Sequence, residues 1–192
     1  MSDLETYLDV LFEGLDGYVY SPVKTTDNWE QNWFSYPAQR QELVEHIETC
    51  VGDVYISPAV YSERRATKDA IKKVQTTWVE FDGNEQIHFQ SAPLPTLIVQ
   101  TSFQSHVHCY WRIDPTNRTT VEDTNRRLTH YLQADSSGWD ATQLLRPPGT
   151  INHKRELPVI LINHEKVQYH LDSFESVPKV LERQQKMLLV LI

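Results

Sequence analysis

Hydrophobic positions follow both helical and strand spacing along this chain, and their order predicts a protein that mixes α-helices and β-strands. Leu4, Tyr7, Leu8 and Leu11 share one helical face directly after a Ser2–Glu5 capping box, which predicts an N-terminal helix. Further helices are predicted at 37–51, 67–73, 119–134 and 177–192. Strands are predicted at 17–23, 53–60, 77–81, 96–101, 107–112, 144–145, 158–163 and 169–172.

The mixed order of these elements, with several hairpin pairs, predicts an α+β fold in which helices pack on one face of a sheet. No internal repeat or low-complexity linker interrupts the pattern, so we expect a single domain over 1–192. Within it we expect an N-terminal helix-and-strand lobe (1–50), a core (53–175) and a C-terminal helix (177–192). The aromatic residues around Trp29, Trp33 and Tyr36 favour packing within that lobe over base stacking.

Composition places the chain among globular proteins, with 40% hydrophobic and 23% charged residues in 192. No apolar run reaches the roughly 18–20 residues that cross a bilayer, and the acidic N-terminus lacks the features of a signal peptide. We therefore expect no membrane association and a cytoplasmic location. Cys50 and Cys109 have no zinc-binding spacing, and their small number favours a reducing compartment.

The formal net charge of −8 argues against broad, non-specific coating of nucleic acid. Positive charge is nevertheless concentrated in two segments. Each is either a solvent-exposed face or a local site that binds phosphates. The first contains Arg64, Arg65, Lys68, Lys72 and Lys73, and the second contains Arg146, His153, Lys154 and Arg155.

The strand at 77–81 carries two acidic residues at its end, Glu80 and Asp82. Residues two apart in a strand share a face, so these like charges repel unless cations lie between them. Divalent metal ions would make the pair favourable, which points to phosphoryl transfer. The alternative is an ordinary turn, because Gly83-Asn84 follows directly.

Two other clusters carry chemistry. His106 and His108 share one strand face after a polar turn at 102–105, where an imidazole can bind phosphate, ligate a metal or shuttle a proton. Further on, the loop 135–140 precedes Arg146 and a Pro-Pro-Gly turn that presents Asn152, His153 and Lys154. Arginine and lysine in such a turn can hold a triphosphate.

The three clusters in this order resemble the archaeo-eukaryotic primase superfamily. They are most similar to the primase-polymerase domains of phages and plasmids, including RepB-like plasmid primases. The matching motifs are Glu80/Asp82, a Ser/Thr-rich turn leading to His108-Cys109-Tyr110-Trp111, and an aspartate before Leu145-Arg146-Pro147-Pro148-Gly149-Thr150-Ile151-Asn152-His153-Lys154. The chain departs from the family in carrying Glu before Asp, and in having Gln104 and Ser105 where relatives often have glycine.

This resemblance implies an RRM-like mixed or antiparallel sheet flanked by helices, and template-directed nucleotide transfer. It implies two Mg²⁺ or Mn²⁺ ions held by Glu80, Asp82 and a third carboxylate. Asp135 is favoured for that third position by its spacing before Arg146, and Asp140 is the alternative. His108 would be catalytic and contact the triphosphate. The implied nucleotide site comprises Ser102, His108, Arg146, Asn152, His153 and Lys154.

The partners implied are a single-stranded DNA template, an NTP or dNTP, and a replicative helicase, fused or in trans. The location would be the host cytoplasm if a phage encodes the chain. Template contacts are expected from the first basic segment, through Arg64, Arg65, Lys68 and Lys72, with the N-terminal aromatic residues as a further candidate surface.

Two other functional classes stay open. Rolling-circle initiators and relaxases use a His-hydrophobic-His metal motif, which His106-Val107-His108 matches, together with a nucleophilic tyrosine. That interpretation leaves Glu80, Asp82 and the Arg146–Lys154 block unexplained. The second class is a non-catalytic module that binds single-stranded nucleic acid without divalent ions, against which the acidic strand argues.

Overall fold

The computed structural model describes residues 1–83, 87, 89 and 92–180. Its first element is helix α1 (Asp3–Phe12), which begins at the predicted capping box. The Ser2 hydroxyl accepts a hydrogen bond from the Glu5 backbone N–H at 3.2 Å, and the Glu5 carboxylate accepts one from Ser2 N–H at 2.8 Å. The predicted apolar face of α1, including Tyr7, Leu8 and Leu11, is buried.

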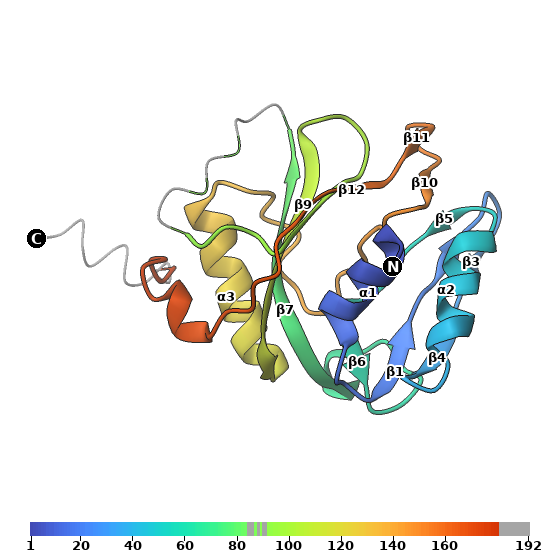
Figure 1. Ribbon diagram of the computed structural model, residues 1–192, viewed down its shortest axis with the longest axis horizontal. Coiled ribbons are helices and arrows are strands. Elements are labelled where there is room, and N and C mark those ends of the chain that lie inside the picture. Colours follow the sequence, from blue (N-terminus) through green and yellow to red (C-terminus); the bar gives the residue numbers. More distant parts are fainter. Residues whose placement is uncertain (84–86, 88, 90–91, 181–192) are drawn as a thin grey trace, which may run out of the picture.

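A large antiparallel sheet forms the centre of the molecule (Figure 1). Its two long strands are β7 (Ile71–Asp82) and β9 (His106–Thr116), which pair with each other over most of their length. In the described part of the chain, the sheet runs in the order β12-β8-β9-β7-β6-β1-β4. The other strands are β12 (Ile160–His164), β8 (Leu97–Gln100), β6 (Ala59–Tyr61), β1 (Gly17–Tyr20) and β4 (Trp33–Tyr36). The predicted α+β class is confirmed.

Helices cover both faces of β7 and β9, and not one face as predicted (Figure 1). On one face the Tyr7 ring of α1 packs edge-on against Tyr110 of β9, at 5.4 Å between centroids. On the other face α3 (Arg118–Tyr131) places Asn125 against β7, where it accepts hydrogen bonds from the Thr77 hydroxyl and from Trp78 N–H. Tyr110 faces α1 and the next residue, Trp111, faces away, because strand side chains alternate.

Two smaller sheets extend this core. β2 (Val23–Lys24) lies between β3 (Trp29–Glu30) and β5 (Asp53–Val54) in a three-stranded sheet. β10 (Ile151–Asn152) and β11 (Leu157–Pro158) form a hairpin, which lies beside β5 in Figure 1. Helix α2 (Arg40–Thr49) packs on the same side of the molecule, within the predicted 37–51 segment.

The predicted strands 17–23 and 53–60 are each divided between two sheets, and three other predicted elements also differ from the structure. The expected helix at 67–73 is a single 3₁₀ turn, η1 (Lys68–Ala70), because Ile71 already pairs with β6 at the start of β7. The strand at 144–145 reduces to one bridge between Leu145 and Ile56. The strand at 169–172 becomes a second 3₁₀ turn, η2 (Leu171–Phe174), which buries Phe174.

The predicted C-terminal helix falls mostly on residues 181–192, which lie outside the described residues. Residues 177–180 are not helical. Of the helices that the structure describes, none is long and apolar enough to cross a membrane.

Candidate active site

A cavity of about 190 Å³ lies where the ends of β7 and β9 meet the β10–β11 hairpin. It brings together residues from all three clusters that the sequence singled out. Those lining it are Tyr55, Glu80, Asp82, Thr101, Ser102, His106, His108, Leu144, Arg146, Asn152, Lys154 and Arg155. The cavity is thus lined by acidic groups from β7 and by basic groups from residues 146–155.

Each acidic residue of β7 is paired with a histidine of β9. The antiparallel register sets Glu80 opposite His108 and Asp82 opposite His106. The Glu80 Oε2–His108 Nε2 distance is 3.3 Å, and the Asp82 Oδ1–His106 Nδ1 distance is 2.6 Å. Glu80 is largely enclosed while the Asp82 side chain is 68% exposed, so the two carboxylates sit at different depths in the same cavity.

Two buried tyrosines form a chain of polar contacts that ends at the His108 ring. The Tyr110 hydroxyl lies 3.5 Å from His108 Nδ1, and the Tyr7 hydroxyl lies 3.1 Å from that of Tyr110. Burial raises the pKa of both tyrosines, so both hydroxyls keep their protons at neutral pH. Helix α1 therefore helps to orient the His108 ring toward Glu80.

The loop that follows α3 encloses Glu80. Asp135 N–H donates to the Glu80 backbone oxygen at 2.8 Å, and Gln143 Nε2 donates to Glu80 Oε1 at 2.5 Å. Gly138 lies against the same carboxylate, so that a Cβ at this position would come 2.5 Å from Glu80 Oε1. Trp78 Nε1 fixes the loop by donating to Gly138 O at 2.8 Å. This loop determines where the Glu80 carboxylate lies.

Neither candidate for the third carboxylate lines the cavity. Asp135 Oδ1 accepts a hydrogen bond from Ser137 N–H within its own loop. Asp140 pairs with Lys68 and accepts hydrogen bonds from Thr142. Among the described residues, no group of three His, Cys, Asp or Glu side chains is placed to hold a metal ion. In the structure Glu80 and Asp82 thus line the cavity together, and neither Asp135 nor Asp140 joins them there.

The basic part of the cavity is organised by Asp53 of β5. Its Oδ1 atom lies 2.5 Å from Arg146 Nη1 and accepts a hydrogen bond from His153 N–H at 2.9 Å. Arg146 also donates to the Tyr55 hydroxyl at 2.8 Å, with its guanidinium 4.6 Å from that ring centroid. Arg146 is therefore fixed before any ligand arrives.

Other predicted nucleotide-binding residues are distributed around the same end. Ser102 and Lys154 line the cavity, and Asn152 Nδ2 donates to Thr101 O at 2.9 Å. His153 lines an adjacent groove instead. Lys154 and Arg155 form no ion pair within the described residues, so their charge is available to a ligand.

The first basic segment does not line the cavity, and four of its five cations have partners elsewhere. Arg65 pairs with Glu63 and Asp69, Lys68 with Asp140 and Glu122, and Lys72 with Asp16. Arg64 lies over the Tyr18 ring, at 5.4 Å from its centroid. These predicted template contacts therefore stand apart from the candidate site.

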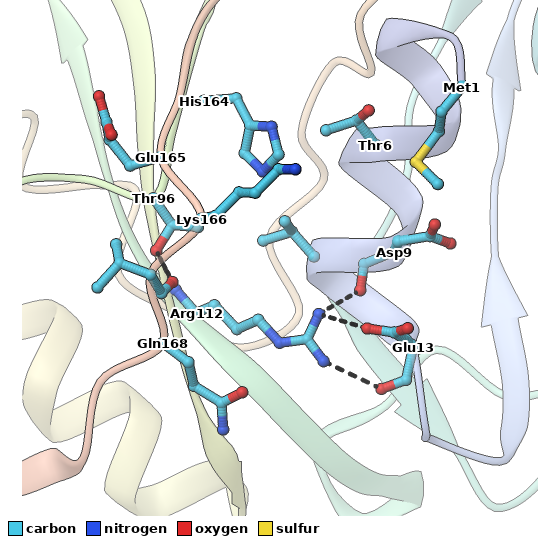
Figure 2. Close-up of a pocket in the computed structure, with 12 residues that line it drawn as sticks. Met1, Thr6, Asp9, Glu13, Thr96, Arg112, His164, Glu165, Lys166 and Gln168 are labelled. Carbon is cyan, nitrogen blue, oxygen red and sulfur yellow. Dashed lines mark hydrogen bonds and ion pairs between the residues drawn. The ribbon is translucent and has the colours of Figure 1, made fainter.

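A second hollow, of about 370 Å³, separates α1 from the segment after β12 (Figure 2). Its central cation is Arg112, which donates to the Asp9 and Glu13 carbonyls and pairs with the Glu13 carboxylate at 3.1 Å. A cation at the end of a helix stabilises the carbonyls that lack partners within the helix. Arg112 therefore attaches α1 to β9, and we assign it no chemistry.

Similar folds are found among solved structures. The archaeo-eukaryotic primase (AEP) domain of the cyanophage S-2L primase-polymerase matches with a TM-score of 0.69 and 13% identity, over 92% of this chain and 97% of that one. The chain has the fold of an archaeo-eukaryotic primase catalytic domain. Primase RepB′ matches with a TM-score of 0.64 and 18% identity, over 98% of this chain and 66% of that one. The catalytic domain of primase RepB′ in complex with initiator DNA matches with a TM-score of 0.63 and 17% identity, over 98% of this chain and 93% of that one.

No protein-family model matches the sequence, and no curated protein matches it significantly. The similar structures therefore confirm the primase fold that the sequence motifs predicted, but their sequence identities are too low to assign an activity to this chain.

Some residues that shape this candidate site were not found from the sequence. Asp53 and Tyr55 are far from Arg146 in the chain, and Gln143 and Gly138 stand in a loop without a recognisable motif. No local pattern marks any of them, because their role depends on contacts between distant segments.

Proposed function

We propose that this chain is the catalytic domain of a template-directed nucleotidyltransferase, a DNA primase, a DNA polymerase or both. The observation that supports this most is that Glu80 and Asp82 line one cavity together with Arg146, Lys154 and Arg155. The acidic groups suit metal ions and the basic groups suit a triphosphate. A site with charges of both signs fits the transfer of a nucleotide better than simple binding of a nucleic acid.

Glu80 and Asp82 fit Mg²⁺ or Mn²⁺, because both present hard oxygen ligands on one strand face. Magnesium sites in such enzymes commonly use one or two carboxylates, with substrate phosphates and water as the other ligands. The carboxylates of Glu80 and Asp82 are therefore sufficient protein ligands for our proposal. Asp135 would become a third ligand if its loop moved toward the cavity. Two bound ions would lower the pKa of an attacking hydroxyl and neutralise the triphosphate charge.

The protein's own contribution is to bind and orient the substrate. Arg146, fixed by Asp53 and Tyr55, would hold the triphosphate in a defined place, and Lys154 and Arg155 would add charge. The primer 3′-hydroxyl would then attack the α-phosphorus as the bond to pyrophosphate breaks. His108 would approach the phosphates from β9 with its ring held by Tyr110.

Primer extension tests the proposal. The protein is incubated with a primed single-stranded DNA template, dNTPs or NTPs, and either Mg²⁺ or Mn²⁺. We expect metal-dependent extension that is abolished in Asp82→Ala and in Glu80→Ala/Asp82→Ala, with both variants folded by circular dichroism. Glu63→Ala, which removes an exposed carboxylate far from the cavity, serves as the matched control. Extension by Asp82→Ala at the wild-type rate would refute the assignment.

An unprimed template in the same assay asks whether the enzyme also starts chains. If the wild type extends nothing with either metal, the sample is examined on a denaturing gel for DNA linked covalently to a tyrosine. Such an adduct would support the rolling-circle alternative over ours.

The wider setting is part of the same proposal. We propose a role in phage or plasmid replication, with a single-stranded DNA template and a helicase as partner. The support is the name of one similar structure, a cyanophage primase-polymerase, and the initiator DNA bound to another. We also retain the interpretation of 1–192 as one catalytic domain.

A further inference from the structure

Trp29 is an exposed aromatic ring that the structure holds in a fixed orientation. It is 44% exposed, and among the Trp, Tyr and Phe residues that the structure describes only Phe103 is also exposed. One face of the indole stacks on Tyr55, at 5.6 Å between centroids and 28° between planes. Its Nε1 donates to the Tyr20 hydroxyl at 3.2 Å. An ordered aromatic ring at the surface is a ready platform for stacking.

The ring belongs to a row of side chains that leads to the candidate active site. In the three-stranded sheet, Trp29 of β3 lies opposite Lys24 of β2, which lies opposite Asp53 of β5. Residues directly opposite in antiparallel strands share a face. Asp53 holds Arg146, and Tyr55 lies under both Trp29 and the Arg146 guanidinium. One face of this small sheet therefore continues into the cavity.

A groove of about 440 Å³ runs along the same side. It is lined by Lys24, Thr25, Thr26, Val51, Gly52, Asp53, His153 and Lys154. Lys154 also lines the catalytic cavity, so the groove and the cavity are neighbours. Lysine, histidine and threonine side chains along one groove fit a chain of phosphates, which accept hydrogen bonds and carry negative charge.

Within the described residues the lysines of this groove form no ion pair, in contrast to Arg65, Lys68 and Lys72 of the first basic segment. The groove lysines are Lys24 and Lys154, and the other three cations all have acidic partners. A phosphate that binds Lys24 therefore displaces no protein carboxylate, while one that binds Lys72 competes with Asp16. Unpaired positive charge that can bind a nucleic acid therefore lies beside the small sheet.

We propose that the face of the β3-β2-β5 sheet binds single-stranded nucleic acid. A base stacks on Trp29, and the adjacent phosphates contact Lys24 and the groove that leads to Lys154. Aromatic stacking combined with a basic groove is the usual means of binding single strands without reading their sequence. The inference builds on the proposed function, since this path would lead a template strand to the cavity.

Binding is measured by fluorescence anisotropy with a labelled oligothymidylate in EDTA, which separates it from catalysis. We expect Trp29→Ala to weaken binding about tenfold and Trp29→Phe to retain most of it, because both rings stack. Lys24→Ala should weaken binding about fivefold at 0.1 M salt and reduce the log–log salt slope by about 0.7, as expected for one lost phosphate contact. The matched control is Lys73→Ala, which removes an exposed cation of β7 that forms no ion pair with any residue the structure describes.

Wild-type affinity in both Trp29→Ala and Lys24→Ala would overturn the inference. So would an equal loss in Lys73→Ala, which would indicate general charge attraction only. Thermal melting checks each variant, and Lys24→Ala keeps the test decisive if Trp29→Ala unfolds. Primer extension by the wild type distinguishes the two proposals. If the wild type extends primers and the variants bind as tightly as it does, only the proposed binding surface is refuted. If the variants bind more weakly but the wild type extends no primer, only the proposed polymerase activity is refuted.

Discussion

Substitution of Gly138 by alanine should impair nucleotide incorporation without changing any proposed ligand. The added Cβ would lie 2.5 Å from Glu80 Oε1 and 3.0 Å from Glu80 Cδ, whereas ordinary contact begins at 3.4 Å. The carboxylate must therefore move by about 0.9 Å, and a displacement of about 1 Å in an active site can cost about 100-fold in rate. The φ angle of Gly138 is outside the left-handed range, so alanine strains the backbone little.

Single-nucleotide incorporation measures this effect as kcat/KM with Mg²⁺ and with Mn²⁺. We expect a loss of about 100-fold in Gly138→Ala, with a free energy of unfolding within about 1 kcal/mol of the wild type because the contact is with a movable side chain. Ser136→Ala, an exposed change in the same loop, should incorporate normally. A normal rate in Gly138→Ala would show that the position of Glu80 does not limit the reaction.

Two further predictions concern buried and paired charges. Asp53→Ala should lower the free energy of unfolding by about 3–5 kcal/mol in chemical denaturation, because it leaves the largely buried Arg146 without its partner, and Asp53→Asn should lower it less. Burial raises the pKa of Asp140, but hydrogen bonds from Lys68 and Thr142 outweigh it and bring the pKa below 3.8. That stabilisation is present above the unfolded-state pKa and is lost as the pH falls through the lowered one. In Asp140→Asn the free energy of unfolding should therefore fall less steeply as the pH is lowered, as measured by urea denaturation from pH 2 to 6. The same pH dependence as in the wild type would contradict the lowered pKa of Asp140.

Several local features follow directly from short stretches of sequence. The Ser2–Glu5 box starts α1 where predicted, because both of its hydrogen bonds join residues three apart. The alternation at Glu80 and Asp82 places both on one face of β7, because strand geometry fixes that relation whatever the partner strand. The order of strands and helices was likewise enough to predict the α+β class.

Elements that depend on distant partners were predicted less well. The segment 67–73 has helical composition, but pairing with β6 makes a strand of its last three residues and leaves only a 3₁₀ turn before them. The basic residues around it looked available for a template, yet acidic residues from other elements pair with them. Propensity is a weak effect of tenths of a kcal/mol per residue, and sheet pairing outweighs it.

The sequence by itself determined which residues are candidates for the chemistry and, through strand periodicity, which of them share a face. Only the tertiary structure decided how these residues meet. The register of β7 with β9 pairs each carboxylate with a histidine, and Asp53 fixes Arg146 from 93 positions away in the chain. Periodicity is a property of the local backbone, whereas register and long-range pairing are selected by burial of the whole core, so a short motif cannot encode them.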